Sequence, residues 1–164
     1  MRPDATALAN YFIDLAVKGN VELRQFGLMK RIYIAHGFCL AHYDMSALDP
    51  RFDVVEAWKN GPVIPSIYHS FKHNKNNPIM EKSVIVDFGD DDGLDFDFKT
   101  PELSNEKIIH VADFVWDRYM HMTDFELIKL THRKGTPWAY CYREGKNNPI
   151  PDSLTKLFYK KLLI

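Results

Sequence analysis

The sequence predicts a mainly α protein: a single compact helical domain, residues 1–164, with a small β-hairpin or short sheet. The chain has 164 residues, 46% of them hydrophobic, which is enough for one core without disulfides or a metal. Several segments place apolar residues at helical spacing behind good N-cap residues. Only two short regions alternate as strands do, and no repeat or long linker divides the chain.

Two helices are predicted in the first quarter of the chain. Asp4 is expected to cap a helix that runs to about Lys18, and Gly19 to end it in the left-handed conformation. A longer helix is expected over residues 25–43. Gly27 and Gly37 lie inside it, where each costs about 1 kcal/mol relative to alanine. Their presence predicts close contact with neighbouring helices.

The middle of the chain is predicted to hold the strands. RFDVVEAW (51–58) fits a short strand, Gly61-Pro62 a break, and Pro65 the start of a short helix to about residue 72. Residues 83–88 and 94–98 flank GDDDG (89–93), the pattern of a β-hairpin. Phe96 and Phe98 alternate with acidic residues, so one face is expected to be wet.

The last third is predicted to be helical. Asn105 is expected to cap one helix, and Thr123 with Glu126 forms a capping-box pattern for a second, which runs to about residue 131. Pro137 fits the first position of a third helix. The last helix is expected to start at Ile150-Pro151-Asp152.

Composition and charge narrow the classes of partner. The chain has 21 basic and 22 acidic residues, a net charge of −1, which provides no sequence-wide field for nucleic acid or anionic lipid. Lys30-Arg31, and three lysines in the last helix, give only a weak helix-turn-helix signal. The N-terminus has no signal-peptide pattern and no segment is apolar enough to span a membrane. We therefore expect a cytoplasmic protein with Cys39 and Cys141 reduced and no membrane partner, and the charge does not favour a nucleic-acid partner.

No cofactor or metal is expected. The acidic run around GDDDG does not fit a calcium loop, because Phe88 and Lys99 would take positions 1 and 12. His69 and His73 have helical spacing but lack a partner glutamate. No phosphate-binding loop or nucleophile elbow is present. A small enzyme that uses Glu56 with His36 or His69 remains an alternative, as does a DNA-binding autoregulator.

The aromatic content is a further signal, with three Trp, eight Tyr and eleven Phe. Such residues dominate the energetics of binding surfaces, although an aromatic-rich core would show the same composition. Composition alone leaves both interpretations open.

Three segments, in order, resemble one known family. They are LMKRIYIAHGFCLAHY (28–43), FDVVEAWKNGPVIPSIYHSF (52–71) and LTHRKGTPWAYCY (130–142). An Ile-Pro pair and a terminal amphipathic helix follow them. The combination resembles the Panacea, or SocA-like, antitoxin domain family, which includes phage-associated GepA-type proteins. The similarity runs from about residue 7 to residue 163.

The resemblance implies an antitoxin with no catalytic residue or cofactor, which neutralises a cognate protein toxin by direct binding. Delivery of the toxin to a cellular protease is another mode open to the family. The expected toxin-binding surface is aromatic: Tyr33, Trp58, Lys59, Tyr68 and Trp138. The remaining conspicuous motif residues are expected to hold the fold: His36, Glu56, Gly61, Pro62, Pro65, His132 and Pro137.

Overall fold

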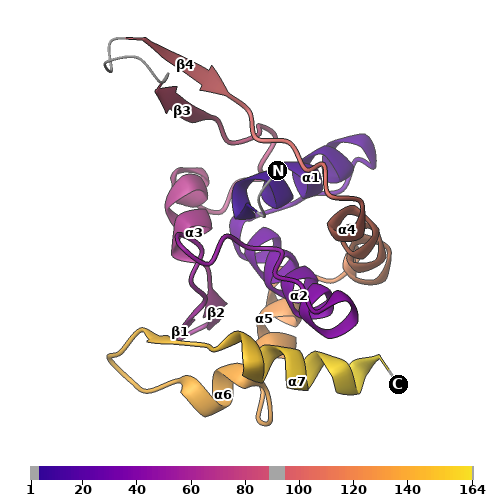
Figure 1. Ribbon diagram of the computed structural model, residues 1–164, viewed down its shortest axis with the longest axis vertical. Coiled ribbons are helices and arrows are strands. Elements are labelled where there is room, and N and C mark those ends of the chain that lie inside the picture. The colour runs from indigo at the N-terminus through magenta and orange to yellow at the C-terminus, as the bar shows by residue number, and fades with distance from the viewer. Residues whose placement is uncertain (1–3, 89–94, 164) are drawn as a thin grey trace.

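The prediction of a mainly α fold is confirmed by the computed structural model, which describes residues 4–88 and 95–163 (Figure 1). The α-helices are α1 (Ala5–Lys18), α2 (Gln25–Tyr43), α3 (Pro65–Phe71), α4 (Glu106–Tyr119), α5 (Asp124–His132), α6 (Pro137–Cys141) and α7 (Asp152–Leu162). A 3-10 turn, η1 (Lys72–Asn74), extends α3. The strands are β1 (Glu56–Trp58), β2 (Gly61–Val63), β3 (Ile85–Phe88), β4 (Phe96–Lys99) and β5 (Asn148–Pro149).

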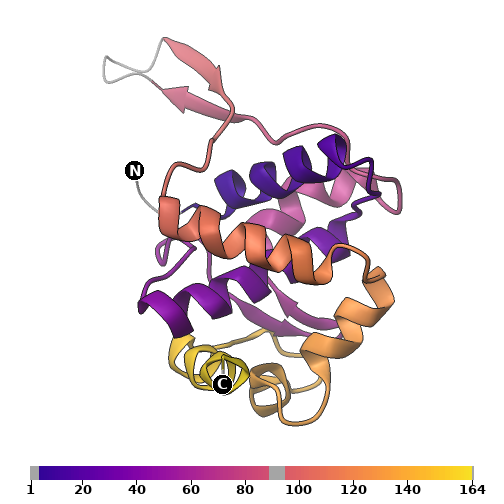
Figure 2. The ribbon, with the colours of Figure 1, turned by 90° about the vertical axis from the view of Figure 1, so that its right-hand side faces the viewer.

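Helix α2 is the centre of the molecule. It packs against α1, α4, α5 and α7, and most of its residues are buried on every side (Figures 1 and 2). The two glycines within it are close-contact points, as predicted. A Cβ on Gly37 would lie 2.3 Å from the Tyr159 ring of α7, and one on Gly27 would lie 2.3 Å from Asp124 Oδ1.

The N-cap predictions are confirmed, and one C-cap prediction is wrong. The Asp4 and Asn105 side chains accept from backbone N–H groups of α1 and α4, and Thr123 and Glu126 form the capping box of α5. Gly19, however, has φ −86°, and Asn20 takes the left-handed conformation with φ 51°. Asparagine tolerates the left-handed region better than most residues, so the left-handed residue after α1 is one position later than predicted.

A three-stranded antiparallel sheet of order β2-β1-β5 lies beside α2 and α3. The predicted strand over 51–58 is shorter, only Glu56–Trp58, and Gly61-Pro62 does not break the chain but forms β2. The turn falls at Lys59-Asn60, which lets Trp58 pair with Gly61. Strand β5 pairs with β1 and was not predicted, since a two-residue strand leaves no alternation to detect.

Strands β3 and β4 form a separate two-stranded antiparallel hairpin, as predicted, which projects beyond α1 at one end of the molecule (Figures 1 and 2). The GDDDG stretch and Leu94 fall outside the described residues. In the described part of the chain, no helix has both the length and the apolar character needed to cross a bilayer.

Candidate interaction surface

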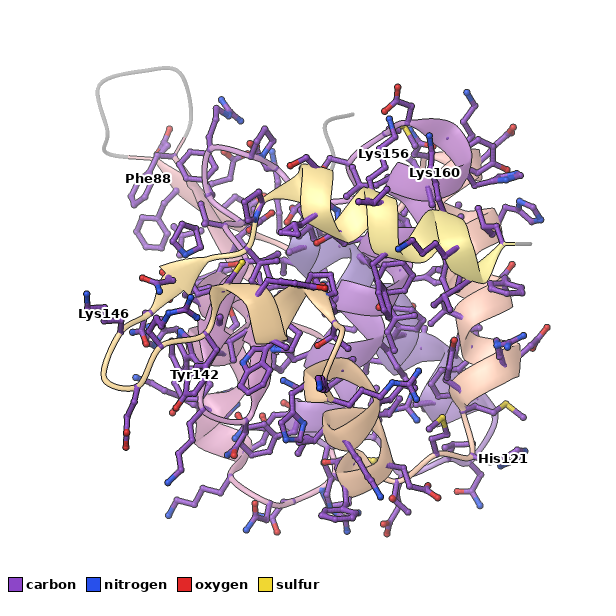
Figure 3. The ribbon with its side chains drawn as sticks, turned by 90° about the horizontal axis from the view of Figure 1, so that it is seen from below. Phe88, His121, Tyr142, Lys146, Lys156 and Lys160 are labelled. Carbon is purple, nitrogen blue, oxygen red and sulfur yellow. The ribbon has the colours of Figure 1, made fainter. Side chains whose placement is uncertain are left out.

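Five rings from four helices and strands lie in one group, which we call the aromatic cluster: Trp58, Tyr68, His132, Trp138 and Tyr142. The Trp138 Nε1 donates to the Trp58 carbonyl at 2.6 Å. The Trp58 and Tyr68 ring centroids are 5.1 Å apart, and Trp138 stacks on Tyr142 at 4.6 Å. His132 meets the edge of Trp138 at 5.2 Å. Figure 3 shows Tyr142 beside α6, at the end of the molecule opposite the β3–β4 hairpin.

The structure brings four of the five expected toxin-binding residues together. Trp58, Tyr68 and Trp138 are half-buried, and Lys59 is exposed in the adjacent turn. Tyr33 is different, because it is 1% exposed and packs from α2 against α7, with its hydroxyl 3.4 Å from Thr155 Oγ1. Its place in the core separates it from the other four.

The Glu56 carboxylate is hydrogen-bonded to the side chain of Trp58. Its Oε2 accepts from Trp58 Nε1 at 2.7 Å, which side chains two positions apart on one strand face allow. His36 instead pairs with Asp152, and His69 is exposed beside the Tyr68 ring. The hydrogen bonds of the described residues therefore join Glu56 to neither histidine that the enzyme alternative requires.

A Ser–His–Asp series that the sequence did not suggest surrounds His36. His36 is 1% exposed, its Nε2 lies 2.9 Å from Asp152 Oδ1 and its Nδ1 lies 3.5 Å from Ser46 Oγ. The hydrogen bond from His36 lowers the pKa of the Asp152 carboxyl. Ser46 Oγ, however, donates to Leu48 O at 2.8 Å, so its proton is not directed at the imidazole as an activated nucleophile requires. We interpret the series as a tie between α2 and the start of α7.

Lys30, which the sequence suggested only as part of a weak DNA-binding signal, lies in the core. It is 0% exposed and its Nζ donates to Pro62 O at 2.7 Å. Desolvation by burial lowers the pKa of Lys30 to about 7. Position 30 follows Phe26 by four and precedes Tyr33 by three, so the apolar spacing of the helix could have revealed its inward direction.

Gly61 and Pro62 have structural roles in this contact. Gly61 has φ +106°, which favours glycine, and a Cβ there would lie 3.0 Å from Lys30 Nζ. Pro65 and Pro137 begin α3 and α6, where a missing N–H costs nothing. Four of the seven motif residues therefore lie in β2 or at the first position of a helix.

Arg31 is also buried, which removes the basic pair that suggested DNA binding. It is 2% exposed, and its Nη2 donates to Tyr119 O at 3.0 Å and Met122 O at 3.2 Å, at the end of α4. Neither Lys30 nor Arg31 can meet a phosphate from inside the core. No group of three His, Cys, Asp or Glu side chains that could hold a metal occurs among residues 4–88 and 95–163.

Comparison with known proteins gives consistent matches. The family model for "Antitoxin SocA-like, Panacea domain" matches residues 28–139, from α2 into α6. The chain is 29% identical over 135 residues to Antitoxin SocA of Caulobacter vibrioides (strain NA1000 / CB15N), an alignment that covers 82% of this chain and 68% of that protein. No solved structure matches. The matched segment contains the aromatic residues at 58, 68 and 138 and all seven motif residues, and the chain belongs to the SocA-like, Panacea-domain family of antitoxins.

Proposed function

We propose that this protein is the antitoxin of a toxin–antitoxin pair and neutralises its cognate toxin by direct protein–protein binding. The observation that carries the proposal is the family match over residues 28–139, which includes most of the central helix and four of the five residues of the aromatic cluster. The role is non-enzymatic, exerted in the cytoplasm by residues 1–164 acting as one domain.

The aromatic cluster is a proposed contact surface for the toxin. Lys59 presents a charge in an exposed turn, and half-buried Trp58, Tyr68 and Trp138 present ring edges beside it. Aromatic side chains on rigid elements are favoured at binding hot spots, because little conformational freedom is lost on binding. Tyr33 is buried in the core and is not itself a contact.

Co-expression tests the proposal. The open reading frame beside this gene should arrest growth when induced alone and should be harmless when this protein is co-expressed. The two purified proteins should also elute together on size-exclusion chromatography. A neighbouring product that is harmless alone, or that stays toxic beside this protein, would contradict the antitoxin role.

Measuring the lifetime of the toxin distinguishes two modes of neutralisation, blocking by binding and delivery to a protease. If binding blocks the toxin, its level after translation stops should be the same with and without this protein. If this protein delivers the toxin to a protease, the toxin should disappear faster when both are present. The first result is the one that we propose, since direct binding alone accounts for neutralisation.

A further inference from the structure

The β3–β4 hairpin carries an apolar face that no part of the described protein covers. Val86 pairs with Phe98 and Phe88 pairs with Phe96, and directly paired residues in an antiparallel ladder point to the same face. We call these four residues the hairpin face. Each is 44–67% exposed, although contiguous apolar patches on a monomer are normally shielded.

The hairpin face is much less shielded than the aromatic cluster. In the cluster, Trp58, Tyr68 and Trp138 are half-buried against one another and the body. Phe88 and Phe98 are instead 67% and 65% exposed. Figure 3 shows Phe88 at the margin of the molecule, well apart from Lys156 and Lys160 of α7. On the hairpin, four exposed apolar side chains therefore lie together on one face.

The base of the hairpin is firmly attached to α1. Asn10 is 2% exposed, and its Nδ2 donates to the carbonyls of Ser83 and Pro101, each at 3.0 Å. Its Oδ1 accepts from Ser83 N at 2.8 Å. One buried amide thus holds the chain as it enters and as it leaves the hairpin. An isolated two-stranded hairpin is only marginally stable, so this attachment fixes the direction in which the face is presented.

Charge identifies the kind of partner. Residues 83–99 contain six aspartates and one lysine, a net charge of −5, while the rest of the chain has 20 basic and 16 acidic residues, or +4. Asp97 lies on the opposite face of the ladder from the phenylalanines, and Asp95 immediately precedes β4. Nucleic acid and anionic membranes would be repelled by this segment, and two hairpins would repel each other.

We propose that the hairpin face is a second contact surface for the toxin, separate from the aromatic cluster, and that it docks an apolar patch on the toxin that is bordered by lysine or arginine. This rests on the proposed function, because the toxin is the protein partner that function requires. Val86, Phe88, Phe96 and Phe98 supply the buried centre of the contact. Asp97, on the other face of the ladder, and Asp95, just before β4, supply the negative potential that attracts those basic residues.

The test measures the affinity of the full-length protein for the purified product of the neighbouring reading frame, by titration calorimetry. The double variant Phe88→Ser/Phe96→Ser removes two opposed rings from the hairpin face. We expect its Kd to rise at least about 30-fold, which is the 2 kcal/mol of a binding hot spot at 1.4 kcal/mol per tenfold. Thermal unfolding should be unchanged, because both rings are exposed.

Matched control variants test whether the effect is specific to the hairpin face. Phe125→Ser removes a ring that is 73% exposed on α5, and Ile85→Ser removes an apolar side chain from the other face of the hairpin. Both should bind as the wild type does. Asp95→Lys/Asp97→Lys should weaken binding, and Asp117→Lys, on the exposed side of α4, should not. If the serine variant does not fold, the comparison of Asp95→Lys/Asp97→Lys with Asp117→Lys still tests whether the hairpin binds the toxin.

The outcomes separate the two proposals. A wild-type protein that does not bind or neutralise the toxin would overturn the proposed function and the hairpin inference together. A wild type that binds, with hairpin variants that bind equally well, would overturn the hairpin inference alone. A wild-type dimer that the serine variant converts to a monomer would overturn it too, because the occupant would be a second copy.

Discussion

At the scale of single residues, the least expected feature is a lysine with no contact to water. The Lys30 side chain is fully buried. Among the described residues, its ammonium donates a hydrogen bond to the backbone carbonyl of Pro62. A carbonyl does not compensate the charge as a carboxylate would, so burial lowers the pKa from 10.5 to about 7. Near neutrality the fold therefore carries a lysine that readily loses its proton.

This lysine predicts how stability depends on pH. The unfolded chain holds the Lys30 proton up to about pH 10.5 and the folded chain only to about pH 7, so unfolding takes up a proton between these values. Stability should therefore rise with pH across this window, by up to about 1.4 kcal/mol per pH unit. Urea unfolding of the wild type and Lys30→Met, from pH 7 to 9.5, isolates the effect. Parallel curves for the two proteins would contradict it.

A second prediction at this scale concerns Asn10, which uses both ends of its amide at the base of the hairpin. Asn10→Ala should destabilise the protein by about 1–3 kcal/mol, because it leaves two carbonyls and one N–H without their partner. Asn10→Asp should cost at least as much, since a carboxylate would face the carbonyls of Ser83 and Pro101. Hydrogen exchange provides the check: the Ser83 amide should lose protection in Asn10→Ala and the amides of α2 should not.

At the scale of elements, the contact of α2 with α7 depends on Gly37. Alanine would gain about 1 kcal/mol of helix propensity, but its methyl group would lie 2.3 Å from the ring of Tyr159. Overpacking costs about 1–3 kcal/mol, and the fully buried ring has little room to move, so we expect net destabilisation. Denaturant unfolding measures it. In Gly37→Ala/Tyr159→Leu the smaller side chain should accommodate the methyl group, so the double variant should be more stable than the sum of the two single effects. Strict additivity would contradict a direct clash.

The elements that the sequence predicted are those with local causes. Asp4, Asn105 and the Thr123–Glu126 box act within four residues of themselves, so the starts of three helices could be located from sequence. Strand β5 exists only because β1 lies beside it. The hairpin was predicted from its alternation, but alternation indicates one wet face and does not reveal that the other face also lacks cover. Whether the second face is covered depends on how the hairpin is placed relative to the helices, which local sequence does not determine.

At the scale of the whole molecule, the candidate site was only partly predictable. Trp58, Tyr68 and Trp138 lie together, from segments up to 80 residues apart. Tyr33 could not be excluded from sequence, because a tyrosine on a helix fits the core and the surface equally well. Lys30 and Arg31 were misjudged for a related reason. Their charges suggested solvent, but inside the protein they donate to carbonyls from β2 and the end of α4, which only folding brings close.

The uneven charge of the whole chain leads to the last prediction. A projecting apolar hairpin is an aggregation hazard, and charges on or near it are a common protection. Replacing the six aspartates of residues 83–99 by asparagine keeps the side-chain size and removes the repulsion between copies. We expect this variant to self-associate at concentrations where the wild type does not, as measured by sedimentation velocity. Adding Phe88→Ser/Phe96→Ser should restore the wild-type behaviour, because the apolar contact is then lost as well. If the asparagine variant sediments as the wild type does, the aspartates do not guard the hairpin, and their role would be confined to attracting a basic partner.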